Sequence, residues 1–174
     1  MATFRHQYRR LPRHALVLCA VLVENPMNLG GLCRLAEALR LEALVLRDLK
    51  LTENRKFRQL AVTTQHWQPL QECPLEQLPG WIQGQQQRGY RVLALARRPD
   101  SQSLWAAPLP QRAVLLLGRE LTGIPSEILT QCDQTLAIPQ YGLVDSLNVQ
   151  TAAAMALSEY IRQWGMDQPP ENLE

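Results

Sequence analysis

The sequence has few cysteines and histidines, and neither residue type is spaced for a disulfide framework or a metal site. The four cysteines, Cys19, Cys33, Cys73 and Cys132, contain no CxxC pair. Scattered cysteines indicate reduced thiols in a cytoplasm rather than a disulfide frame or a zinc site. The three histidines also lack the spacing of ligands, so we expect no metal.

Long apolar runs are missing too. The longest candidate, residues 15–23, spans nine residues, whereas a membrane helix needs about 20. The basic N-terminus is not followed by the apolar core and cleavage site of a signal peptide. We therefore expect a cytoplasmic protein without a membrane segment.

Three common motifs of nucleotide binding and catalysis are absent. Gly30-Gly31 is not part of a GxGxxG fingerprint, and the chain has no P-loop. Ser146 as a nucleophile would need a neighbouring base, yet no histidine follows His66 and no GxSxG is present. These absences argue against a dinucleotide enzyme, a P-loop NTPase and a lipase-like hydrolase.

The charge is distributed unevenly along the chain. Residues 1–14 carry four arginines and no acidic residue, and without these arginines 14 basic and 16 acidic residues remain. A basic arm on a nearly neutral body suggests a polyanionic partner, and a solvated tail is the alternative.

Strand-like and helix-like segments alternate along all 174 residues, which fit a single domain. The pattern predicts an α/β fold, a doubly wound parallel sheet with helices on both faces. We expect a basic arm over 1–14, the domain over 15–166 and a loose tail over 167–174. Expected strands are 15–23, 43–46, 67–70, 91–96, 113–117 and 135–138, and expected helices are 28–39, 52–60, 75–88, 125–132 and one that starts at 145–146.

Ligands of open parallel sheets bind beyond the carboxyl ends of the strands, so the loops there are the expected site. Arg34 stands among small and apolar residues, where a charge needs an anion. An ion pair with Glu37 or Glu120 is the alternative to a ligand phosphate. Glu120 follows a buried strand and is expected to bind that arginine or an amine of a ligand, or else to be a surface acid.

The segment 138–160 combines a strand end, a loop and an alanine-rich helix. Asp145 and Ser146 are typical of a helix start. Small residues on several faces would let other backbones approach this helix closely. We expect Ser146 and Asn148 to point into a site at its N-terminus.

Three blocks together resemble the SpoU/TrmH family of RNA ribose methyltransferases, within the SPOUT superfamily. They are NPMNLGGLCRLAEAL (25–39), LLLGRELTGIP (115–125) and IPQYGLVDSLNVQTAAAMALSEY (138–160). The resemblance covers residues from about 15 to 163. It implies a SPOUT fold with a C-terminal trefoil knot, which is a rare exception to ordinary chain topology. It also implies a homodimer that packs the knot regions together.

The resemblance further implies S-adenosylmethionine as methyl donor and a ribose 2′-hydroxyl as acceptor. The residues that it assigns to the cofactor are Leu95, Gly118, Ile138 and Leu147. Those that it assigns to catalysis are Arg34, Asn28, Glu120, Ser146 and Asn148. The arginine of this family is often drawn as a general base, and that role is the alternative. Because an arginine keeps its proton, we expect Arg34 to clamp an RNA phosphate and to stabilise the developing alkoxide.

Within the family, PMNLGGLCR, RKFRQLAVTTQHWQPL and GRELTGIP look most like the methylase domain of eukaryotic tRNA enzymes that modify guanosine 18. Gln140 departs from the family, because many members have methionine there. Alternative targets of the methyl group are a tRNA ribose at the wobble position and an rRNA ribose. Alternative functions are a non-catalytic RNA-binding knot protein and an unrelated enzyme for a small substrate. Basic residues expected to contact RNA phosphates are Arg5, Arg9, Arg10, Arg13, Arg55, Lys56 and Arg58.

Overall fold

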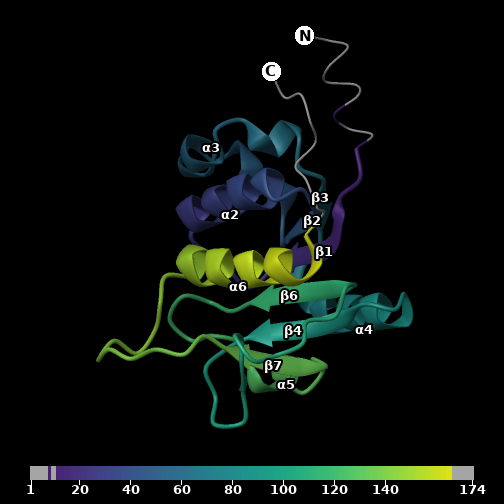
Figure 1. Cartoon of the computed structure of the whole chain (residues 1–174). Coiled ribbons are helices and arrows are strands. Elements are labelled where there is room, and N and C mark those ends of the chain that lie inside the picture. The colour runs from purple at the N-terminus through teal and green to yellow at the C-terminus, as the bar shows by residue number, and fades with distance from the viewer. Residues whose placement is uncertain (1–7, 9–10, 166–174) are drawn as a thin grey trace.

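The computed structural model describes Tyr8 and residues 11–165. A seven-stranded sheet with the order β3-β2-β1-β6-β4-β7-β5 forms its centre, and all neighbouring strands run parallel (Figure 1). The strands are β1 (His14–Cys19), β2 (Leu41–Leu46), β3 (Leu70–Glu72), β4 (Arg91–Leu95), β5 (Gln102–Ser103), β6 (Ala113–Leu117) and β7 (Gln134–Ala137).

Helices cover both faces of this sheet, because successive strand side chains point to opposite sides. Leu16 and Leu18 of β1 join the apolar core under α2, α3 and α6, whereas Val17 and Cys19 join the core under α4 and α5. The predicted doubly wound α/β sheet is therefore confirmed. The helices are α2 (Pro26–Ala38), α3 (Arg55–Ala61), α4 (Leu78–Gln87), α5 (Ser126–Leu129) and α6 (Val149–Trp164), with short 3₁₀ turns η1 (Leu49–Glu53), η2 (Thr64–His66) and η3 (Leu75–Gln77).

Three expectations about local structure are wrong. The strand expected over 67–70 lies later, as β3 (Leu70–Glu72). The last helix starts at Val149, not at Asp145, because the side chain of Asn148 accepts from the N–H groups of Gln150 and Thr151 and so caps it. The two-residue strand β5 pairs with β7 in a segment expected to be a loop. Its few residues carry no periodic pattern by which a strand could be predicted.

Helix α2 lies between α3 and α6, and two glycines allow this close packing (Figure 1). A Cβ at Gly30 would lie 2.2 Å from the backbone oxygen of Phe57 in α3. At Gly31 a Cβ would lie 2.0 Å from the side-chain oxygen of Gln150 in α6. The Gly30-Gly31 pair therefore has a steric role in the fold.

Part of the predicted N-terminal arm is attached to the domain. The guanidinium of Arg13 donates to the backbone oxygens of Leu41 and Trp67. The hydroxyl of Tyr8 donates to Glu37, and the ring of Tyr8 packs edge-on against Trp67. Strand β1 begins at His14, next to the predicted start of the domain at residue 15.

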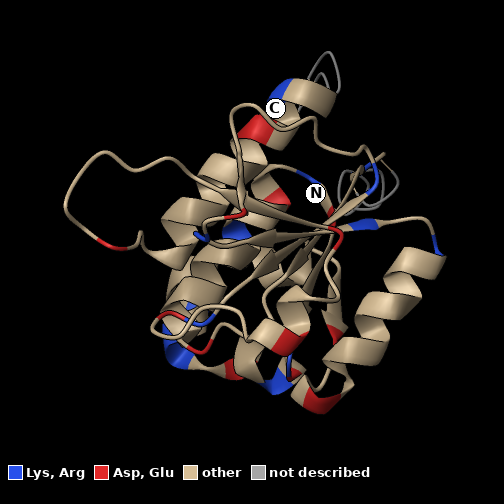
Figure 2. Cartoon of the chain, turned by 90° about the horizontal axis from the view of Figure 1, so that it is seen from below, with Lys and Arg blue, Asp and Glu red and all other residues tan. Residues whose placement is uncertain are grey.

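The loop between β7 and α6 extends away from the body in two views of the chain (Figures 1 and 2). Its apolar side chains are exposed, with Tyr141 at 95% and Leu143 at 103% of full exposure. Asp145 is the charged residue of this loop. Within residues 11–165 and Tyr8, no helix is long and apolar enough to cross a membrane.

Candidate active site

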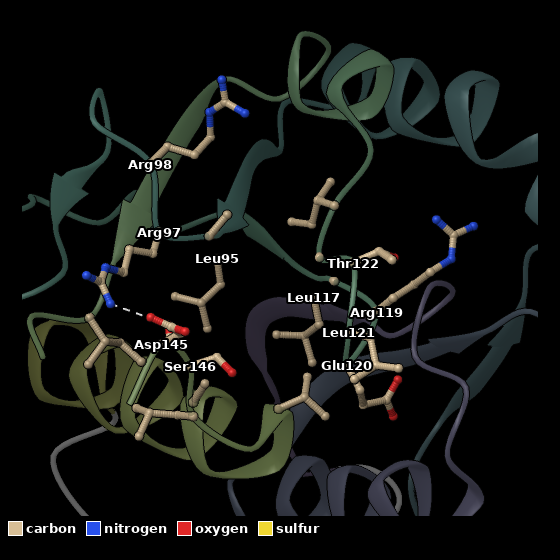
Figure 3. A pocket seen from close by; sticks show the side chains of 18 of the residues that line it. Leu95, Arg97, Arg98, Leu117, Arg119, Glu120, Leu121, Thr122, Asp145 and Ser146 are labelled. Carbon is tan, nitrogen blue, oxygen red and sulfur yellow. Dashed lines mark hydrogen bonds between the residues drawn. The ribbon is translucent and has the colours of Figure 1, made fainter. Parts of the chain in front are cut away.

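A cavity of about 630 Å³ lies beyond the carboxyl ends of β4, β6 and β7, where the sequence predicted the site (Figure 3). This volume falls in the range of small-molecule sites. Its inner wall is apolar and includes Leu117 and Leu136, and its opening carries Arg97, Arg98 and Arg119. The cavity can therefore take a molecule with one apolar and one charged end.

All four residues predicted to bind the cofactor line this cavity, namely Leu95, Gly118, Ile138 and Leu147. Gly118 also has a steric role, since a Cβ there would lie 2.7 Å from the backbone of Gly123. Gly123 itself has a φ of 68°, which favours glycine. The turn from 119 to 123 can thus fold back over the end of β6.

Three predicted catalytic residues form a chain of hydrogen bonds beside the cavity. Nδ2 of Asn148 donates to Oδ1 of Asn28 over 3.1 Å, and Nδ2 of Asn28 donates to Oε1 of Glu120 over 3.0 Å. The chain joins the N-termini of α6 and α2 to the turn after β6.

The direction of every hydrogen bond in this chain is fixed. Oδ1 of Asn148 accepts from the N–H of Gln150, so its amide nitrogen must face Asn28. At the other end, the carboxylate of Glu120 accepts from the N–H groups of Glu24 and Asn25 as well as from Asn28. Since an amide has one acceptor side and one donor side, neither asparagine can turn over without losing a bond.

The environment of Glu120 keeps its carboxyl group ionised. Burial raises the pKa of Glu120, but the hydrogen bonds from Asn28, Asn25 and Glu24 outweigh burial and place the pKa below its ordinary value. Glu120 therefore does not pair with Arg34. The alternative expectation, a free surface acid, is wrong as well. It holds the N-terminus of α2 against the cavity.

Ser146 lines the cavity on the side of the extended loop (Figure 3). One guanidinium nitrogen of Arg97 donates to the backbone oxygen of neighbouring Asp145 over 3.4 Å, across the cavity opening. Arg97 therefore ties the loop of Ser146 to the end of β4. In Figure 3, Arg98 and Arg119 point away from the cavity centre.

Arg34 is exposed on α2 and is not among the residues that line the cavity. The expectation of apolar surroundings for this charge is wrong, because the helix turns the side chain toward water. Among the described residues, neither Glu37 nor Glu120 forms an ion pair with Arg34. Its guanidinium is thus available to an anion from outside this chain.

The residues predicted to contact RNA divide into three groups. Arg55, Lys56 and Arg58 are exposed on α3, next to α2. The guanidinium of Arg13 donates to backbone oxygens inside the domain. Three further arginines, Arg5, Arg9 and Arg10, lie outside the described residues.

The loops after the strands were the expected site, but no role was assigned to the three arginines in them. Arg97, Arg98 and Arg119 lie shortly after the ends of β4 and β6, so their positions past buried strands could have indicated them. No group of histidine, cysteine or acidic side chains suited to a metal ion occurs in the part of the chain that the structure describes.

Comparison with protein-family models identifies the chain. The model of the SpoU rRNA Methylase family matches residues 15–158. The chain belongs to this family. The match spans the sheet, the cavity and most of α6, so the SpoU methylase region is the domain described above.

Individual SpoU relatives agree in sequence and in fold. A mouse protein named tRNA (guanosine(18)-2′-O)-methyltransferase TARBP1 is 37% identical over 157 residues, which are 89% of this chain and 10% of the mouse protein. A structure entitled "Structural insights into the 2-OH methylation of C/U34 on tRNA" is 32% identical, with a TM-score of 0.72 over 85% of this chain and 93% of that one. The A. aeolicus TrmH/SpoU tRNA modifying enzyme is 22% identical and shares the fold, with a TM-score of 0.81 over 93% of this chain and 83% of that one.

The chain therefore spans about a tenth of the length of the mouse relative.

Proposed function

We propose that this SpoU domain transfers a methyl group from S-adenosylmethionine to a ribose 2′-hydroxyl of tRNA, most specifically that of guanosine 18. The observation that carries the proposal is the hydrogen-bonded chain Asn148–Asn28–Glu120 at the edge of the cavity. The name of the mouse relative supports the choice of guanosine 18.

The cavity suits the cofactor in shape and polarity. Leu95, Leu117 and Ile138 form apolar walls for a purine ring, and the guanidinium of Arg97 at the opening suits a carboxylate.

S-adenosylmethionine supplies, when bound, a methyl group that is already activated for transfer. The protein must then hold the ribose hydroxyl in line with that methyl. Asn28 and Asn148, whose amides are fixed by their neighbours, and the hydroxyl of Ser146 orient the ribose. Arg34 stays protonated, clamps an RNA phosphate and stabilises the negative charge that develops on the ribose oxygen.

A second copy of the chain completes this site. Because Arg34 points outward, an assembly that brings α2 of one copy to the cavity of another would place it near the reaction. The exposed apolar rim, Leu121, Tyr141, Leu143 and Val144, supplies a surface for such a homodimer, since exposed apolar clusters mark interaction sites. In this proposal the segment after β7, with its extended loop and α6, is threaded as a trefoil knot and lies in the dimer interface.

RNA lies across the outer side of α2 and α3. Arg55, Lys56 and Arg58 on α3 would neutralise phosphates on the same helical layer as Arg34. Arg5, Arg9 and Arg10 of the arm would add to this contact. For the compartment we propose the cytoplasm, which the scattered cysteines favour.

A second candidate target is the ribose of a wobble nucleotide. The C/U34 structure favours it, because its chain matches this one along 93% of its length. The geometry of the site serves both targets equally.

The test is a methylation assay on bulk unmodified tRNA with labelled S-adenosylmethionine, followed by mass mapping of the product. A 2′-O-methylguanosine at position 18 supports the proposal. A methyl on the wobble ribose retains the reaction and changes the target. Bound cofactor without methyl transfer to tRNA would overturn the tRNA substrate and direct the search to rRNA.

A further inference from the structure

A single hydrogen bond ties the loop after β7 to the body of the domain. Nη1 of Arg97 donates to the backbone oxygen of Asp145, and in the part of the chain that the structure describes no other hydrogen bond joins residues 139–147 to residues outside that segment. The distance of 3.4 Å is long for a hydrogen bond between nitrogen and oxygen. On its own, this bond therefore holds the loop only weakly.

The three arginines at the cavity opening differ in their partners. The guanidinium of Arg98 lies 3.4 Å from the carboxylate of Asp100, and that of Arg119 lies 3.8 Å from the carboxylate of Glu24. Arg97 forms no ion pair among the described residues, and its bond across the opening reaches a neutral backbone oxygen (Figure 3). Arg97 therefore carries the charge that is available to an anionic group at the opening.

The guanidinium of Arg97 can bind two partners at once. It presents several N–H donors in one plane, and the bond to Asp145 uses Nη1 and leaves those of Nε and Nη2 for a carboxylate. A carboxylate that binds there also immobilises the side chain. The bond to Asp145 then no longer has to offset that loss of rotamer freedom, so the two contacts strengthen each other.

We propose that Arg97 binds the carboxylate at the methionine end of the cofactor and the backbone of Asp145 together, and so fixes Ser146 when the cofactor is bound. Ser146 directly follows Asp145 and lines the cavity. Arg97 is thus a positioning residue, because it acts on the ribose through Ser146. This inference rests on the proposed function, since it specifies how the cofactor prepares the same site for RNA.

A comparison of two ligands tests the first contact by calorimetry. The ligands are S-adenosylhomocysteine and its decarboxylated counterpart, which keeps the ammonium and lacks the carboxylate. The native protein should prefer the carboxylate ligand by roughly 10-fold, because a charge-assisted hydrogen bond is lost with the other ligand. In Arg97→Gln this preference should fall to within about 3-fold.

Arg98→Gln is the matched control, because Arg98 is an arginine of the same loop that pairs with Asp100 and points away from the cavity centre. It should keep the full preference for the carboxylate ligand. The melting temperature of ligand-free Arg97→Gln should equal that of the native protein, since Arg97 is exposed. A variant that only damaged the fold would lower this temperature.

Hydrogen exchange of residues 139–147 tests the second contact, with each ligand at saturation. In the native protein, the carboxylate ligand should slow exchange by about 3-fold or more relative to the decarboxylated one. Arg97→Lys keeps the charge but lacks the planar fork, so it should retain a preference of about 3-fold and lose the difference in exchange. Because both ligands are compared on the same protein at one concentration, contacts of the rim in a dimer affect both measurements equally.

The outcomes separate this inference from the proposed function. If the native protein binds both ligands equally, Arg97 does not bind the carboxylate and is left to an RNA phosphate, which overturns the inference while cofactor binding stands. Loss of the preference in Arg98→Gln as well would show a general effect of charge and also overturn it. A carboxylate preference without a change in exchange would overturn the link to Ser146. If the native protein binds neither ligand, the proposed cofactor fails, and this inference fails with it.

Discussion

The central strands and the rim of the cavity are similarly apolar in sequence, but they differ in burial. Leu18 of β1 and Leu116 of β6 are completely buried, whereas Leu121 and Leu143 on the rim are 98% and 103% exposed. The strands are covered by helices of the same chain. Apolar side chains that a chain leaves fully exposed around its own cavity indicate that another molecule covers them. In the proposed homodimer, the core stabilises the single chain and the rim contacts the second copy.

The largest effect is expected in the core, from Gly30→Ala. The added Cβ would meet the backbone oxygen of Phe57, which cannot move without shifting α3. We expect a loss of about 3 kcal/mol in the free energy of unfolding, measured with urea. Gly84→Ala in α4 is the matched control, because a Cβ there meets open space. It should stabilise the protein by about 0.5–1 kcal/mol. Equal stability of both variants would contradict the packing argument.

Arg34→Ala should act on function alone. Removal of a group that stabilises charge in the transition state lowers kcat by about 100-fold or more. Because Arg34 is exposed, the free energy of unfolding should change by less than about 0.5 kcal/mol, and affinity for S-adenosylhomocysteine should be unchanged. A near-native turnover rate in single-turnover assays would remove Arg34 from the site.

Leu143→Asp tests the role of the rim. A charge on a fully exposed apolar side chain should weaken self-association by about 10-fold or more, measured by analytical ultracentrifugation, and leave the monomer's fold intact. The control is Val62→Asp, another exposed apolar side chain, which lies at the end of α3. Loss of association in both variants, or in neither, would rule out a specific rim contact.

Asn148→Ala should combine a small effect on stability with a larger one on turnover. Loss of a helix cap costs about 1 kcal/mol. Asn54→Ala removes the corresponding cap of α3, away from the cavity, and should cost a similar amount. A fall in kcat of roughly 10-fold is expected for Asn148→Ala alone, since it also breaks the bond to Asn28. The same turnover in both variants would limit Asn148 to capping.

Glu120→Gln tests the smallest effect, which depends on pH. The pKa of Glu120 is lowered in the folded protein, so its ionised form adds stability above the unfolded pKa of about 4.3. This contribution is lost as the pH falls through the lowered folded-state pKa. The variant should therefore lose stability at neutral pH and show a flatter acid dependence in thermal melts. An unchanged acid dependence would show that other carboxyl groups dominate.

The alternation of segments was enough to predict the parallel sheet and the edge at which the site lies. Leu95, Gly118 and Ile138 meet there because carboxyl ends of parallel strands share one edge. The direction of the Arg34 side chain could not be predicted in this way. Neighbours in sequence lie on different faces of a helix, so small residues around Arg34 do not determine its burial.

The attachment of Arg13 was also beyond sequence patterns. Its bonds to Leu41 and Trp67 join residues far apart in the chain, and local composition carries no record of such contacts. The start of α6 was misplaced because Asp145, Ser146 and Asn148 are all favourable caps, and the amide chain to Asn28 selects the last of them.

The contact between Gly30 and α3 has a consequence for how this domain should be studied by saturation mutagenesis. Every side chain at position 30 meets the same carbonyl of Phe57, so a growth or activity screen would find it as intolerant as a residue of the reaction centre. Such a screen needs a parallel readout of cellular protein abundance. Positions that lose abundance belong to the scaffold, and positions that keep it while losing methylation define the catalytic surface.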